Sequence, residues 1–168
     1  MVDVRVSSKK GLEDITFHYT NPEMVKDLIK LIPFEEGDKV LDAGSGKNKV
    51  WYNLLPDYVK KYECEIEDGC DFLQWGKKVD WVIGNPPFAI LHKFLEKAIT
   101  VSNKGIAFLL SIRAFNKLTP RRLEFYKENG FYINKIHIVS DKRWFGRYYF
   151  VVLTKKQSGF ITWNLQSY

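Results

Sequence analysis

Short apolar runs alternate along the chain with amphipathic stretches, and proline, glycine or asparagine bounds most of them. The stretches have the apolar spacing of helices, and the short runs have the composition of buried strands. Asn21-Pro22 and Thr119-Pro120 are typical helix starts, because proline is favoured in the first helical turn. The predicted helices are 21–33, a short segment ending at Leu55, 91–99 and 119–129. The predicted strands are 39–42, 62–66, 79–84, 106–112, 133–139 and 148–154, with a further candidate at 159–163.

This order of elements predicts an α/β fold with one doubly wound, mostly parallel sheet that ends in a reversed carboxyl-terminal strand pair. The sequence contains no internal repeat and no linker, so residues 1–168 are expected to form a single domain. Ligands of such sheets bind beyond the carboxyl ends of the strands. Two unusual sequences fall at such ends, Asp42-Ala43-Gly44-Ser45-Gly46 and Asn85-Pro86-Pro87-Phe88. We therefore expect the functional site at this edge of the sheet.

The formal net charge of +6 is concentrated in the carboxyl-terminal third of the chain. Residues 1–112 hold 15 Lys and Arg against 17 Asp and Glu, whereas residues 113–168 hold 11 against 3. Aromatic residues are interleaved with these cations, which favours a polyanion such as nucleic acid over a plain solvated basic face. The candidate nucleic-acid contacts are Arg113, Arg121, Arg122, Arg143, Trp144, Phe145 and Arg147.

The apolar runs are too short for a membrane span, and residues 1–5 lack the pattern of a signal peptide. We therefore expect a soluble, cytoplasmic protein without a membrane partner. The two cysteines, Cys64 and Cys70, are too few for a disulfide framework and have no partners at metal-ligand spacing. They are expected to be ordinary thiols, and no metal site is expected.

The glycine-rich segment after the first predicted strand has the composition of a ligand-binding turn. Gly44 and Gly46 permit a tight turn and a close approach of the backbone to a ligand, and the Asp42 carboxylate suits an amine or hydroxyl donor. The third glycine of the dinucleotide pattern is absent, so a ligand without a pyrophosphate fits better. A purely structural turn is the alternative.

Acidic residues follow the second predicted strand. Glu65 is placed to accept the hydroxyls of a ribose, and Asp71 beside the backbone N–H of Phe72 can recognise the edge of an adenine ring. The alternative interpretation is a solvated acidic edge formed by Glu63, Glu65, Glu67 and Asp68.

Two consecutive prolines end the third predicted strand. They fix two φ angles and remove two backbone donors, so the segment from Asn85 to Phe88 is held stiffly at the mouth of the strand. A simple turn does not require this stiffness.

The tetrapeptide lies about forty residues after the glycine turn, and in this order the chain resembles the Rossmann-like S-adenosylmethionine-dependent amino-methyltransferases, especially the adenine-N6 type. The signature of that family is Asn or Asp, two prolines and an aromatic residue. Residues 20–25 also resemble the Thr-Pro-Pro-Glu-x-Val segment with which one subgroup of DNA adenine methyltransferases closes over the methionine moiety, with Asn21 in place of the first proline. The resemblance covers roughly residues 17–154.

The resemblance implies S-adenosyl-L-methionine as cofactor and methyl transfer to the N6 amine of adenine in DNA or RNA. The implied cofactor-binding residues are Thr20, Asp42, Gly44, Gly46, Glu65, Asp71, Phe72 and Asn85. The implied catalytic residues are Asn85, Pro86, Pro87 and Phe88. The turn that contains residues 143–146 resembles the hairpin turn that places an aromatic ring over the target base.

Two departures from the family pattern are visible. Only four residues separate Ile66 from Asp71, so the usual helix and edge strand do not fit, and a trimmed sheet is expected. No segment is long enough for a target-recognition domain, so a protein partner or a homo-oligomer would supply target recognition. The alternatives are a protein glutamine-amide N-methyltransferase, whose related motif usually ends in Tyr rather than Phe88, and a noncatalytic nucleic-acid-binding subunit of a methyltransferase complex.

Overall fold

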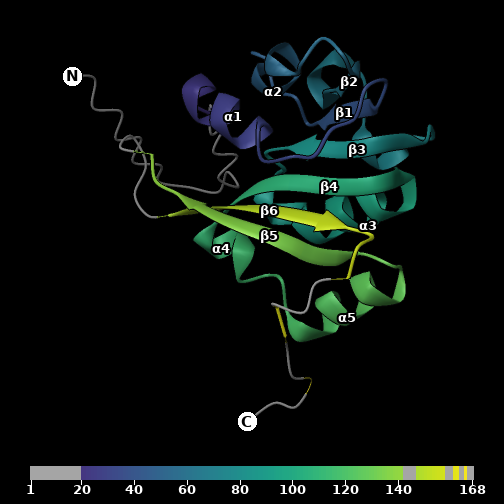
Figure 1. Ribbon diagram of the computed structural model, residues 1–168, viewed down its shortest axis with the longest axis vertical. Coiled ribbons are helices and arrows are strands. Elements are labelled where there is room, and N and C mark those ends of the chain that lie inside the picture. Colours follow the sequence, from purple (N-terminus) through teal and green to yellow (C-terminus); the bar gives the residue numbers. More distant parts are fainter. Residues whose placement is uncertain (1–19, 142–146, 158–160, 163–164, 166–168) are drawn as a thin grey trace, which may run out of the picture.

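A computed structural model describes residues 20–141, 147–157, 161–162 and 165, which form a single mixed sheet flanked by helices (Figure 1). Within this part of the chain, six strands lie in the order β2-β1-β3-β4-β6-β5. The strands are β1 (Lys39–Ala43), β2 (Lys60–Cys64), β3 (Val79–Gly84), β4 (Ser102–Ser111), β5 (Tyr132–Val139) and β6 (Tyr148–Thr154). The first four pair in parallel, and β6 pairs antiparallel with both β4 and β5. The predicted fold class is therefore confirmed.

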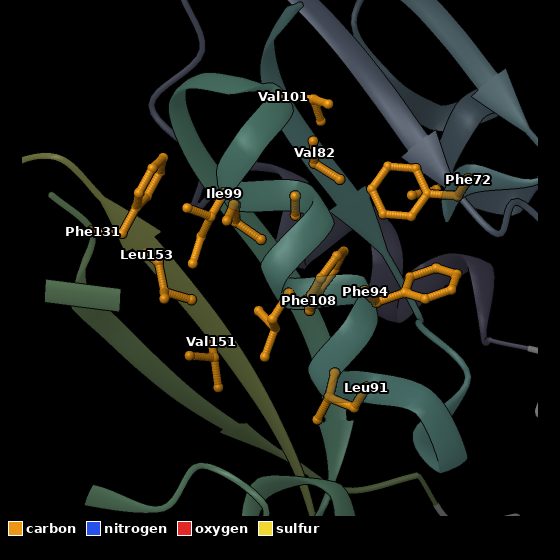
Figure 2. Packing of buried hydrophobic residues seen from close by; sticks show 14 of the residues in the cluster. Phe72, Val82, Leu91, Phe94, Ile99, Val101, Phe108, Phe131, Val151 and Leu153 are labelled. Carbon is orange, nitrogen blue, oxygen red and sulfur yellow. The ribbon is translucent and has the colours of Figure 1, made fainter. Parts of the chain in front are cut away.

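Helices cover both faces of the sheet. The α-helices are α1 (Pro22–Ile29), α2 (Val50–Leu54), α3 (Leu91–Val101), α4 (Ile112–Phe115) and α5 (Pro120–Glu128), and the 3-10 turns are η1 (Ile66–Asp68), η2 (Phe72–Gln74) and η3 (Phe88–Ile90). Apolar residues of α1 and α2 pack on one face, and those of α3 and α5 pack on the other. Along β4, Phe108 enters the α3 side while Leu109 enters the α1 side, because successive strand residues point to opposite faces. Figure 2 shows the α3 side of this core, where Phe94 and Phe108 lie.

Some predicted boundaries were wrong. The second strand is Lys60–Cys64 rather than 62–66, because Glu65 already caps the turn η1. The fourth strand begins earlier than predicted, at Ser102, and the short helix α4 was not predicted. The candidate strand at 159–163 lies largely outside the described residues, and Ile161 and Thr162 are not in a strand.

The trimmed sheet is confirmed at its β2 edge. Only the turns η1 and η2 connect β2 to β3, and β2 is the last strand on that side of the described sheet. The expectation of two free thiols was wrong, since the structure joins Cys64 and Cys70 by a disulfide. The turn η1 reverses the chain and brings their Cα atoms to 5.2 Å, which sequence spacing alone does not reveal. None of the described helices is both long and apolar enough to cross a membrane.

Candidate active site

The glycine turn (residues 42–46) and the diproline segment (residues 85–88) lie side by side at the carboxyl edge of the sheet. They follow β1 and β3, which are neighbouring parallel strands with Asp42 opposite Ile83. Gly44 has a φ of 72°, and a Cβ added there would lie 3.6 Å from the Phe94 ring and 4.0 Å from Pro87. The topology therefore places the two predicted motifs side by side.

Gly84 is a residue of this site that the sequence analysis did not single out. Its φ is 136°, and an added Cβ would lie 2.9 Å from Asp42 Oδ1 and 3.1 Å from the carbonyl oxygen of Ala43. Only glycine allows β3 to pass so close to the end of β1, and the next residue is Asn85. The available signal was a glycine that ends an apolar strand immediately before the diproline segment.

Asp42, the residue of β1 that stands two positions before Gly44, is fully buried. Its Oδ2 accepts a hydrogen bond of 3.0 Å from the backbone N–H of Tyr52, and its Oδ1 has no hydrogen-bond partner among the described residues. Burial raises the pKa of Asp42 to about 7, and the negative charges of Glu63 and Glu65 contribute to the increase. A hydrogen-bond donor or a cation placed at Oδ1 would give this oxygen a partner and would offset the free-energy cost of burying the ionised carboxylate.

Glu63 of β2 and Glu65, which caps η1, are hydrogen-bonded to the glycine turn rather than forming a solvated edge. Glu65 is buried, and its Oε2 accepts a hydrogen bond of 2.6 Å from the backbone N–H of Gly46. Glu63 accepts from the Ser45 hydroxyl at 2.9 Å and from Lys49 Nζ at 2.7 Å. The carboxylates of Glu63 and Asp68 raise the pKa of Lys49 above its ordinary value. Glu67, in contrast, is exposed.

Asp71 and Phe72 begin the turn η2, and the Phe72 ring packs on that of Phe94. Asp71 Oδ1 accepts from the backbone N–H of Leu73 at 2.9 Å and so caps η2. Phe72 is buried, with its ring centroid 4.9 Å from that of Phe94, whose ring also faces Gly44. Phe94 thus joins the two predicted parts of a cofactor site.

The diproline segment is fixed by contacts from distant parts of the chain. Asn85 Nδ2 donates to the Thr20 hydroxyl at 3.4 Å, although the two residues are 65 positions apart. Pro86 is buried and Pro87 exposed, and the Pro87 carbonyl accepts from the N–H of Ile90 at 3.2 Å to form η3. Phe88 is half-buried and packs against the cores on both faces of the sheet.

Several of the predicted nucleic-acid contacts lie near this edge. Arg113 is exposed on α4, directly after β4, and Arg147 is exposed beside Tyr148, which pairs with Ser111 at the carboxyl end of β4. Arg121 is exposed on α5, whereas Arg122 is half-buried. The predicted contacts Arg143, Trp144 and Phe145 lie outside the described residues.

Metal ligands do not gather in the described part of the chain, where no group of three or more His, Cys, Asp or Glu side chains could hold an ion. Three carboxylates nevertheless lie close together at this edge: those of Glu63 and Glu65 accept hydrogen bonds from the glycine turn, and the charges of both act on Asp42. The arrangement suits a ligand with hydroxyl and cationic groups.

Comparison with known proteins identifies the fold. The 23S rRNA methyltransferase ErmE is similar over 85% of this chain and 71% of its own, with a TM-score of 0.62 and 14% identity. The ribosomal protein L11 methylase of Lactobacillus delbrueckii subsp. bulgaricus is similar over 80% and 78%, with a TM-score of 0.59 and 15% identity. The magnesium protoporphyrin IX methyltransferase of Synechocystis PCC 6803, with bound SAH, is similar over 80% and 83%, with a TM-score of 0.56 and 13% identity.

No family model matches the sequence, and no curated protein matches it. The chain has the Rossmann-like fold of the class I S-adenosylmethionine-dependent methyltransferases. By their names, these three proteins methylate 23S rRNA, ribosomal protein L11 and magnesium protoporphyrin IX. The fold alone therefore does not determine the substrate.

Proposed function

We propose that the protein is an S-adenosylmethionine-dependent methyltransferase that acts on the N6 amine of adenine in nucleic acid. One observation carries this proposal: Asn85-Pro86-Pro87-Phe88 stands at the carboxyl end of β3, beside the glycine turn that follows the neighbouring parallel strand β1. The exposed Arg113 and Arg147 beside this edge support a nucleic-acid substrate, and the 23S rRNA methyltransferase ErmE is an example of this fold with such a substrate.

The residues present fit the cofactor. Asp42 Oδ1, which is buried without a partner among the described residues, suits the ammonium group of the methionine moiety. Glu65 has acceptor capacity beyond its bond to Gly46 for the ribose hydroxyls, and Asp71 with Phe72 suits the adenine edge. An added Cβ at Gly46 would meet nothing within 4 Å, so the turn leaves space beside its backbone. When bound, S-adenosylmethionine supplies an electrophilic methyl group on a sulfonium.

The diproline segment would prepare the target amine. The lone pair of an exocyclic adenine amine is delocalised into the ring, which makes it a poor nucleophile. We infer that the Asn85 side-chain oxygen and the Pro86 carbonyl each accept one amine hydrogen, and that Phe88 stacks on the unpaired base. The two prolines fix these acceptors before the adenine binds. Positioning and electrostatic stabilisation therefore activate the amine without a strong general base.

Other substrates are less well supported by the site. A glutamine-amide methyltransferase would use the same acceptors on a planar amide, but the exposed cations at this edge favour a polyanion. A noncatalytic subunit has no physical need for the stiff Asn85 segment. The site fits adenine in DNA and adenine in RNA equally well. A protein partner or a second copy would supply recognition of a target sequence.

The proposed function is tested by methyl transfer from labelled S-adenosylmethionine to four substrates. Duplex DNA, single-stranded DNA, RNA and a protein extract are incubated with the protein, and modified nucleosides are identified by mass spectrometry. We expect N6-methyladenine in at least one nucleic acid. Label found only in protein would overturn the nucleic-acid assignment, and the absence of cofactor binding by calorimetry would overturn the enzymatic one.

Replacement of Glu65 by glutamine is expected to weaken S-adenosylmethionine binding about tenfold or more, because a charged acceptor of ribose hydroxyls is lost. The amide oxygen can still accept from the Gly46 N–H, so the glycine turn should keep its shape, although the bond from the Glu67 N–H to the second oxygen is lost. Calorimetry measures the dissociation constant. The exposed neighbour provides the control, Glu67→Gln, for which affinity should not change; equal affinity of both variants would remove Glu65 from the cofactor site.

A further inference from the structure

We propose that Lys117 is a positioning residue that fixes the diproline segment for catalysis, an inference that rests on the proposed function. Lys117 is half-buried in the connection between α4 and α5. Its Nζ donates a hydrogen bond of 2.6 Å to the carbonyl oxygen of Phe88. Lys117 lies outside the motif from Asn85 to Phe88, and this contact joins positions 29 residues apart, so the sequence does not predict it.

The Lys117 bond adds to a small number of backbone contacts that hold the diproline segment. Pro86 and Pro87 have no backbone N–H, so at these two residues the segment can be held only through its carbonyls and its side chains. The Pro87 carbonyl is already used by Ile90 within η3. The next carbonyl, that of Phe88, accepts from the Leu91 N–H at the end of η3 and also from the Lys117 ammonium, which adds a charge-assisted bond at the residue proposed to stack on the target base.

The backbone of Lys117 is itself fixed by both flanking helices. Its N–H donates to the Ala114 carbonyl at 3.0 Å, and Ala114 is fully buried in α4. Its carbonyl accepts a hydrogen bond of 2.6 Å from Arg122 Nη1 of α5. Ser111, the last residue of β4, caps α4 through its hydroxyl. The anchor on Phe88 is therefore connected to the rigid sheet rather than to a loose loop.

A different role for Lys117 would be a contact to a nucleic-acid phosphate, since it lies in the basic third of the chain. The two roles predict different kinetics. A phosphate contact mainly supports binding and its salt dependence, whereas an anchor of the catalytic segment supports the geometry of the reacting complex. The existing bond to Phe88 favours the anchor.

The test compares Lys117→Met, Lys117→Arg and Lys78→Met. Lys78 is a matched control because its Nζ also donates to a backbone carbonyl at 2.6 Å, that of Thr100, but it precedes β3 at the opposite edge of the sheet. For Lys117→Met we expect kcat to fall about tenfold to a hundredfold, as for a small misplacement of reacting groups. KM for nucleic acid and the cofactor dissociation constant should stay the same. Lys117→Arg should restore part of kcat, and Lys78→Met should match the wild type.

Hydrogen exchange provides a second measurement that does not need activity. Backbone amides of residues 88–91 should exchange faster in Lys117→Met than in the wild type, with no such change in Lys78→Met. If the methionine variant does not fold, Lys117→Gln, which keeps a neutral donor, replaces it in both experiments. An inactive wild type would refute the proposed function, and the exchange of residues 88–91 would still decide the role of Lys117. The proposal would be overturned if Lys117→Met raised KM for nucleic acid and reduced the salt dependence of binding while kcat stayed the same. It would also be overturned if neither kcat nor the exchange of residues 88–91 changed.

Discussion

Replacement of Asn85 by alanine is expected to lower the rate of methyl transfer by about a hundredfold to a thousandfold, while the protein still folds and binds its cofactor. Removing one preorganised group that stabilises a transition state typically has an effect of this size. The Asn85 oxygen is proposed to accept one of the two amine hydrogens, so its loss leaves the amine lone pair delocalised and poorly aimed. Single-turnover rates with saturating S-adenosylmethionine and nucleic acid measure the effect on the chemical step.

Two further variants separate this role from a general loss of structure. Asn85→Asp keeps an acceptor oxygen at the same position and is expected to retain measurable activity. Asn103→Ala removes an exposed asparagine near the amino end of β4, at the opposite edge of the sheet, and should have the rate of the wild type. A single-turnover rate for Asn85→Ala equal to that of the wild type would refute the adenine-N6 mechanism proposed above.

The sheet and the meeting of the two motifs could be predicted because their signals are local. The runs that become β1 and β3 are apolar on both faces, as expected for parallel strands covered by helices, and each is followed by a distinctive polar or proline-rich segment. Parallel neighbouring strands place such segments at one edge. The short spacing between Ile66 and Asp71 also predicted the trimmed sheet, because four residues cannot form a helix and a strand.

The features that sequence reasoning missed depend on contacts between distant residues. The bond from Lys117 to Phe88 and the close approach of Gly84 to Asp42 are examples, and neither has a periodic signature. The Cys64–Cys70 disulfide depends on the shape of a single turn. The end of the second strand at Cys64 was also missed, because a polar residue at a strand end and a capping residue such as Glu65 look alike in sequence.

The buried carboxyl group of Asp42 is expected to make folding stability depend on pH. In the folded state burial raises the pKa of Asp42 to about 7, from an ordinary value of 3.8, and Glu63 and Glu65 add to the increase. Between these two pH values the folded chain binds a proton that the unfolded chain has released. The free energy of unfolding contributed by this group is therefore fully present below about pH 4 and is lost as the pH rises through about 7.

Asp42→Asn removes the titrating group and should remove this component. The full gap between the two pKa values corresponds to about 4 kcal/mol. Relative to the asparagine variant, the wild type is thus expected to lose up to about that free energy of unfolding between pH 4 and pH 8. Urea unfolding across this range measures it, with Asp57→Asn as a control for the loss of one exposed carboxylate. If the free energies of unfolding of the wild type and Asp42→Asn differed by the same amount at every pH, burial would not raise the pKa of Asp42.

The same experiment links stability to the proposed cofactor. An ammonium group placed at Asp42 Oδ1 would stabilise the ionised carboxylate and offset its burial. Saturating S-adenosylmethionine is therefore expected to reduce the loss of stability of the wild type between pH 4 and pH 8, and to leave the profile of Asp42→Asn unchanged in shape. If the cofactor binds but the wild-type profile keeps its slope, the ammonium group lies elsewhere, and the orphaned oxygen of Asp42 has a purely structural origin.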